Sequence, residues 1–104
     1  MGRVNILDYV DQAYSSADGR TIYEVIVNNL KAGRPVQVSF EGIDAIPTSF
    51  VNNAFIPLLQ EFSFEDIKRY VSFIHTTSQI NNMLRSRFQF ETSGERAARK
   101  LALG

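Results

Sequence analysis

The stretch from Val36 to Leu59, VQVSFEGIDAIPTSFVNNAFIPLL, decides the fold. Its first six residues alternate apolar and polar side chains, which is the period-2 pattern of a strand buried on one face. Gly42 ends this alternation, and Pro47 disfavours helix in the residue before it. The stretch therefore predicts a buried strand, a tight loop and an apolar helix, in that order.

Thr48 and Ser49 fall in the first turn of the predicted helix, beside the C-terminal end of the strand. Either hydroxyl can cap the helix by accepting a hydrogen bond from a free backbone N–H group. The same place suits a phosphoacceptor or a docking point, because the start of a helix favours an anion. Both interpretations stay open. If this is a docking point, the surface that contacts the partner would consist of Asp44, Phe50, Asn52 and Asn53.

The run VSFEGID-AIPTSF resembles the signature of the STAS-like domains of unknown function, small bacterial proteins related to anti-sigma-factor antagonists. In that family a hydrophobic strand ends in an Asp/Ser-Phe-x-Gly-Val/Ile element, and a Ser/Thr-Ser-Phe step opens the next helix. A weaker similarity extends over residues 18–88. The matching residues of the run are Ser39, Phe40, Gly42, Ile43, Ile46, Thr48, Ser49 and Phe50.

The resemblance implies a STAS-like α/β fold, with helices packed on one side of a mixed, mainly parallel sheet. It also implies a non-enzymatic regulatory module whose partner is an ATPase related to histidine kinases. In the antagonists, the phosphorylated serine follows an Asp at the start of this same helix. Aligned by the strand, Pro47 replaces that Asp, Thr48 takes the acceptor position with Ser49 next to it, and Phe50 stands where antagonists carry Gly.

The N-terminal third predicts one strand and one helix. Val4, Ile6 and Val10 would share one face of a first strand. In residues 22–30 the apolar side chains recur at helical spacing, so we expect an amphipathic helix with Asp18 as its N-cap. Gly33 and Pro35 then end this helix.

The second half continues the alternation. An apolar helix over residues 50–62 contains Pro57, which predicts a kink or a break. Residues 67–75 are β-branched and aromatic enough for a third strand, and Thr77 or Ser78 would cap a further helix. This β-α-β-α-β-α order, with helix-length crossovers, predicts a mainly parallel sheet. The expected core residues are Val38, Phe40, Ile43, Ile46, Phe50, Phe55, Leu58, Val71, Phe73, Ile80 and Leu84.

The chain has room for one domain over residues 1–104, with an apolar fraction of 44% that supports a packed core. Residues 92–104 predict either a short basic helix, with Thr92 and Glu95 as a capping box, or a loose tail. The sequence favours neither alternative.

The formal net charge is zero, but acids and bases are unevenly distributed. Residues 1–66 hold nine acids and four bases, whereas residues 67–104 hold two acids and seven bases. A nucleic-acid-binding protein would use such a basic half to neutralise phosphates. No recognisable module interleaves aromatic residues with these arginines, so a solvated helix face or a head-to-tail contact between copies is the favoured interpretation.

Residues for enzymatic chemistry are scarce. His75 is the single histidine, and no carboxylates cluster near it in the sequence to complete a metal site. Ser15 and Ser16 lack a paired base, and Gly33 and Gly42 are too isolated to form a phosphate-binding loop. We therefore expect no catalytic residue, no metal and no cofactor.

The chain contains no cysteine, no signal-peptide pattern and no run of about 18 apolar residues, which together favour a cytoplasmic protein that does not span a membrane. Two functional hypotheses remain. The first is a regulatory module that binds a protein partner and is switched near Thr48 and Ser49. The second is a structural or oligomerising domain without a switch, for example a homodimer.

Overall fold

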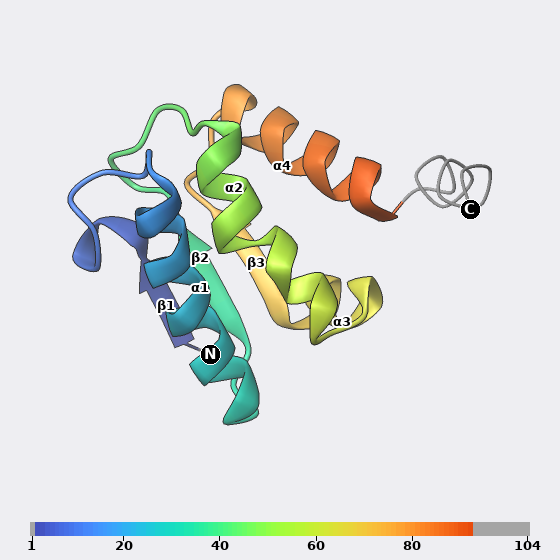
Figure 1. Ribbon diagram of the computed structural model, residues 1–104. Helices are drawn as coiled ribbons and strands as arrows, with labels where there is room; N and C mark the ends of the chain where they lie inside the picture. The colour runs from blue at the N-terminus through green and yellow to red at the C-terminus, as the bar shows by residue number, and fades with distance from the viewer. Residues whose placement is uncertain (1, 93–104) are drawn as a thin grey trace.

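A computed structural model describes residues 2–92, which form three short strands and the helices that connect and follow them (Figure 1). Two of the helical segments, η1 and η2, are 3-10 helices. In chain order, the elements are β1 (Gly2–Asn5), η1 (Ile6–Asp8), α1 (Ser16–Lys31), β2 (Val36–Ser39), α2 (Thr48–Ala54), η2 (Ile56–Gln60), α3 (Phe64–Tyr70), β3 (Val71–Ile74) and α4 (Ser78–Thr92).

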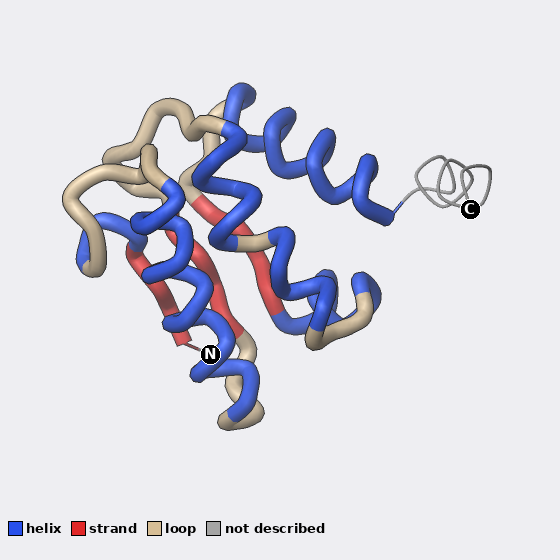
Figure 2. Tube along the Cα trace, in the orientation of Figure 1, coloured by secondary structure: helices blue, strands red, loops and turns tan. Residues whose placement is uncertain are grey.

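The three strands form one sheet in the order β1-β2-β3, and both strand pairs are parallel. Val4, Val38 and Phe73 stand side by side in the register and point toward the helices. On the opposite face, Arg3 and Ser72 are exposed. The helices α1 and α2 lie together over the first of these faces (Figure 2). The structure thus confirms a mainly parallel sheet with helices on one side.

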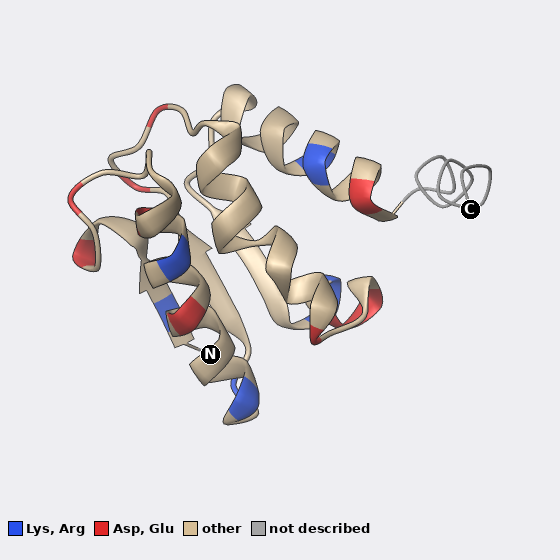
Figure 3. Ribbon diagram, viewed as in Figure 1, with Lys and Arg blue, Asp and Glu red and all other residues tan. Residues whose placement is uncertain are grey.

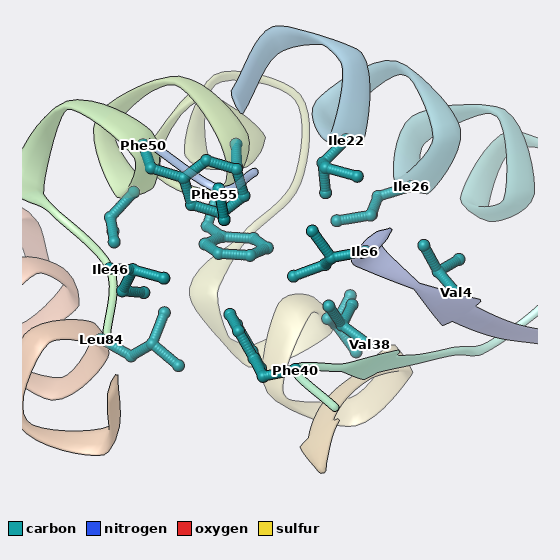
Figure 4. Close-up of a cluster of buried hydrophobic side chains, with 14 of the residues drawn as sticks. Val4, Ile6, Ile22, Ile26, Val38, Phe40, Ile46, Phe50, Phe55 and Leu84 are labelled. Carbon is teal, nitrogen blue, oxygen red and sulfur yellow. The ribbon is translucent and has the colours of Figure 1, made fainter. Parts of the chain in front are cut away.

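The core between the sheet and the helices is built around three phenylalanines (Figure 4). Phe40, Phe50 and Phe55 are completely buried, and the Phe55 ring lies 6.1 Å from that of Phe40 and 5.9 Å from that of Phe50. Of the expected core residues only Phe73 is partly buried. The confirmed members are Val38, Phe40, Ile43, Ile46, Phe50, Phe55, Leu58, Val71, Ile80 and Leu84.

The first strand is shorter than predicted. It ends at Asn5, and the chain turns through η1, so that Ile6 is buried while Leu7 and Tyr9 are exposed. The prediction that Val4, Ile6 and Val10 share one face of a strand is therefore wrong. The period-2 spacing of apolar residues holds only up to Ile6, where the 3-10 turn changes the direction of the chain.

Helix α1 begins earlier than its apolar spacing indicates. Its N-cap is Ser15, not Asp18, and Asp18 is the third helical residue of a capping box: the Asp18 N–H donates to Ser15 Oγ, and Ser15 N–H donates to the Asp18 carboxylate. The predicted end is confirmed. Gly33 adopts a positive φ of 76° directly after the C-cap Ala32, a conformation that glycine adopts without strain.

The predicted break at Pro57 is confirmed. Helix α2 ends at Ala54, Phe55 leaves helical geometry with a φ of −120°, and η2 begins with Pro57 in its first turn. A proline there has no N–H to donate to the preceding turn, so the apolar segment divides into two short helices.

The predicted strand over residues 67–75 is wrong in its first half, where α3 continues to Tyr70. Ser63 caps α3 by accepting a hydrogen bond from the Asp66 N–H. Acidic residues lie in the first turn of α3 and basic residues in its last turn, an arrangement that the helix dipole favours. The cap and the charge pattern at the ends of α3 favour helix more strongly than the β-branched composition favours strand. Only Val71–Ile74 forms a strand.

Helix α4 begins after Thr77, whose Oγ1 accepts a hydrogen bond from the Ile80 N–H, so Thr77 is the cap among the two expected candidates. Thr92 is the last residue of α4, and the expected short basic helix or tail otherwise lies outside the described residues. Within residues 2–92, none of the helices has both the length and the apolar character needed to cross a membrane.

The capping box of α1 predicts a pH dependence of stability. Hydrogen bonds from the Ser15 backbone, together with the Ser15 hydroxyl and the Tyr14 backbone, lower the pKa of Asp18 below its ordinary value of 3.8. A lowered folded-state pKa contributes stability above pH 3.8, and this contribution disappears as the pH falls through the folded-state pKa. We expect Asp18→Asn to be less stable than wild type at pH 6, with a difference that shrinks below pH 3.8 in urea unfolding curves. A difference that is constant with pH would contradict the assigned role.

Candidate functional site

Thr48 and Ser49 are the first two residues of α2, but neither caps it. Pro47 occupies the N-cap position with an extended backbone (φ −85°, ψ 164°), and the cap has no side-chain hydrogen bond. The prediction that one of the hydroxyls caps the helix is therefore wrong. Both side chains are exposed, and α2 extends over only seven residues.

Each hydroxyl contacts a different neighbour. Ser49 Oγ donates a hydrogen bond of 2.9 Å to the carbonyl oxygen of Tyr14, which lies just before α1. Thr48 Oγ1 lies 3.7 Å from the sulfur of Met83 in α4. Ser49 is thus the stronger link, and it joins the start of α2 to the segment that enters α1.

The loop between β2 and α2 is held by the start of α4. The Gln79 side chain accepts from Ile46 N and donates to Ile46 O, both at 2.9 Å. Thr77 Oγ1 donates to the carbonyl oxygen of Asp44 at 2.7 Å. These bonds fix the backbone of the loop and leave Asp44 exposed at its tip.

The other residues of the predicted partner surface have different environments. Phe50 is completely buried, so its assignment to that surface is wrong, and it belongs to the core. Asn52 is exposed, and its Oδ1 accepts a hydrogen bond of 2.8 Å from Arg87 Nε in α4. Asn53 is half-buried and donates to the Ser49 carbonyl oxygen. Asp44 and Asn52 therefore lie on the surface near Thr48 and Ser49.

A hollow of about 290 Å³ lies next to these residues, at the C-terminal end of the sheet. One wall comes from the segment before α1, with Leu7, Asp11 and Tyr14, and the other from the loop after β2, with Gly42 and Asp44. Sequence reasoning missed the first wall, because it placed residues 4–10 in a strand. The signal that could have indicated this wall was the turn-forming, polar composition of the residues that follow Val10.

The end of the molecule around this hollow is acidic (Figure 3). Residues 4–18 and 40–49 contain five carboxylates and no lysine or arginine. Within the described part of the chain, the ion pairs involve other acids, namely Glu61, Glu65 and Glu91. The negative charge around the hollow is therefore not neutralised by ion pairs among these residues.

The strongest pKa shift lies away from this end. The Tyr23 hydroxyl donates a hydrogen bond to Glu61, which raises the pKa of Tyr23 to about 12 and lowers the pKa of Glu61. Lys31 also approaches Glu61, at 3.6 Å. These contacts connect α1 to the end of η2, so the shifts accompany a structural contact between two elements.

His75 is exposed at the end of β3, where its Nε2 accepts a hydrogen bond of 2.8 Å from Arg3 Nη2. This bond spans the sheet from one edge strand to the other. His75 also has a positive φ of 54°. Across residues 2–92, no group of three acidic or histidine side chains is arranged to hold a metal ion.

Comparison with known proteins identifies the family. No curated protein and no solved structure matches the chain. The model of one sequence family, described as a STAS-like domain of unknown function, matches residues 18–81. This range contains α1 from Asp18 onward and the strands β2 and β3. It also contains the whole segment from the loop after β2, which lines the hollow, to the start of α4. The chain therefore belongs to the family of STAS-like domains of unknown function.

Proposed function

We propose that this protein is a non-enzymatic regulatory module that binds a protein partner through the exposed surface formed by Asp44, Thr48, Ser49 and Asn52. Membership of a STAS-like family supports a regulatory or interaction role in general. The observation that carries the specific proposal is the hydrogen bond from the exposed Ser49 hydroxyl to the Tyr14 carbonyl oxygen. It gives a modifiable side chain a defined contact with a second segment of the surface.

Phosphorylation of Ser49 would act through this contact. The phosphoester oxygen carries no hydrogen, so the bond to the Tyr14 carbonyl oxygen would be lost. The phosphate would add a charge of about −1.5 to −2 to a surface that is already acidic. Because Ser49 is exposed, the core beneath it would remain packed. The modification would thus change the surface and leave the fold intact, as a switch requires.

The partner we propose is an ATPase related to histidine kinases, as the resemblance to anti-sigma-factor antagonists implies. Such a partner would both bind the module and phosphorylate it. Ser49 is favoured over Thr48 as the switch, because the Thr48 hydroxyl makes only a weak contact with a thioether sulfur.

The test is capture of the partner from the native host with wild type, Ser49→Ala, Ser49→Glu, Thr48→Glu and the control Ser86→Glu, which introduces the same charge on an exposed position of α4. We expect Ser49→Glu to reduce capture of a histidine-kinase-type ATPase at least about tenfold. Its free energy of unfolding should stay within about 1 kcal/mol of wild type, because an exposed site is changed. Ser86→Glu should retain capture. Equal capture by all variants would refute the switch.

A structural or oligomerising role is the second candidate, and the edge position of β3 favours it. No described strand pairs with the outer edge of β3, and an apolar groove of about 450 Å³ lies beside it, between α3 and α4. An edge strand of this kind can pair with a strand of another copy. Sedimentation at increasing concentration distinguishes the candidates. A protein that stays monomeric at high micromolar concentration would exclude the oligomerising role.

A further inference from the structure

We infer that the acidic hollow, formed by Leu7, Asp11, Tyr14, Gly42 and Asp44, binds an arginine-bearing segment of the protein partner. The inference rests on the proposed function, since the hollow adjoins the surface proposed there. It adds the chemistry of the occupant: a guanidinium group next to an apolar side chain.

The first wall exposes apolar and aromatic side chains. Leu7 is 41% and Tyr14 is 60% exposed, and the neighbouring Tyr9 is 49% exposed. These are three of the five large hydrophobic side chains that are exposed in residues 2–92. Leu7 and Tyr14 line the hollow itself, and exposed apolar groups of this kind are typical of an interaction site. A tyrosine ring also attracts a cation placed over its face.

Each of the two segments that line the hollow contributes one carboxylate. Asp11 comes from the segment before α1, and Asp44 comes from the loop after β2. Neither is in an ion pair with any residue from 2 to 92. A planar guanidinium can donate paired hydrogen bonds to carboxylates and stack on tyrosine, whereas a lysine ammonium offers only a point charge. Arginine is therefore the residue that suits this site.

Both walls are held in place without a ligand. The backbone of Tyr14 is fixed on both sides of its Cα, because its N–H donates to the Asp18 carboxylate at 3.3 Å and its carbonyl oxygen accepts from Ser49. The opposite wall is fixed by the bond from Thr77 to the Asp44 carbonyl oxygen. A site that is ordered in advance loses less entropy when the partner binds.

Gly42 lines the hollow beside Leu7. Its φ of 84° suits glycine, and a Cβ at this position would lie 2.9 Å from Leu7 Cδ1. The two walls therefore touch at Gly42 and Leu7. This contact joins the loop after β2 to η1, so segments far apart in the sequence form one lining.

The test is an NMR titration of the full chain with the acetylated and amidated peptide Gly-Ala-Arg-Leu-Ala-Arg-Gly. A control peptide carries glutamate at both arginine positions. We expect saturable amide shifts confined to residues 7–14 and 42–45, with a Kd below about 1 mM for the arginine peptide. The glutamate peptide should give no saturable shift. Raising the ionic strength from about 0.05 M to about 0.3 M should weaken binding, because surface charges are screened.

Matched variants locate the site. We expect the double variant Asp11→Asn and Asp44→Asn to raise the Kd at least about fivefold, whereas Asp66→Asn on α3, which removes one charge away from the hollow, should leave the Kd unchanged. Unchanged melting temperatures would show that the fold is retained. Shifts centred on the groove between α3 and α4, equal shifts with both peptides, or no saturation would each overturn the inference. Such failure would leave the Ser49 experiment unaffected, because partner capture does not depend on which residues of the partner bind.

Discussion

Phe40→Ala is expected to lower the free energy of unfolding by about 3–5 kcal/mol. Phe40 follows β2 at the centre of the sheet, is completely buried, and lies with its ring 6.1 Å from the rings of both Phe55 and Phe73. Its removal would leave a cavity between the sheet and η2 that the neighbouring rings fill only partly. A domain of ordinary stability would be close to unfolding at 25 °C after such a loss.

Urea unfolding followed by circular dichroism measures this loss, and Phe90→Ala is the matched control. Phe90 is 38% exposed on α4, with its ring near the Arg87 guanidinium, so its truncation should cost less than about 1 kcal/mol. A loss below about 1 kcal/mol for Phe40→Ala would mean that the sheet centre packs differently from the structure described here.

Gly19→Val is expected to destabilise the protein by about 2–3 kcal/mol. Gly19 lies in α1 where this helix packs closely on α2, and an added Cβ would lie 2.7 Å from the Phe50 carbonyl oxygen and 2.9 Å from Asn53 Cβ. The nearest group is backbone, which cannot rotate away. The helices would have to separate, so the gain in helix propensity over glycine would be outweighed.

The control for this prediction is Ala17→Val, two residues earlier on the exposed side of α1. It introduces the same β-branched side chain without a contact to α2 and should cost about 0.5 kcal/mol through propensity alone. Equal effects of the two substitutions on the melting temperature would disprove the close approach of α1 and α2 at Gly19.

The sequence predicts the fold well where local signals and burial agree. The segment from β2 to α2, the end of α1 at Gly33, and the break at Pro57 each follow from side-chain alternation or from backbone chemistry. The errors lie where two signals compete. Apolar alternation suggested a long first strand, but η1 turns the chain after Asn5. In α3, the Ser63 cap prevailed over β-branched composition.

The candidate site is also predictable only in part, because its contacts join residues that are far apart in the sequence. Exposure of Thr48 and Ser49 follows from their place at the start of an amphipathic helix. Their hydrogen-bond partners, Tyr14 and Met83, are 35 residues away, and only the packing of the whole chain brings them near. The apolar pattern predicts the burial of Phe50, and its additional assignment to the partner surface was wrong because the side chain faces the core. A helix two turns long presents few positions to solvent, and the fold sets which ones these are.

The all-parallel sheet also has a consequence for the route by which the protein folds. Strands β1 and β2 are separated by residues 6–35, and β2 and β3 by residues 40–70, so no pair of neighbouring strands is joined by a hairpin. Each pairing must first close a long chain segment, with an entropy loss that contacts nearby in the sequence do not incur. Folding should therefore be slower than in a helical bundle of this length.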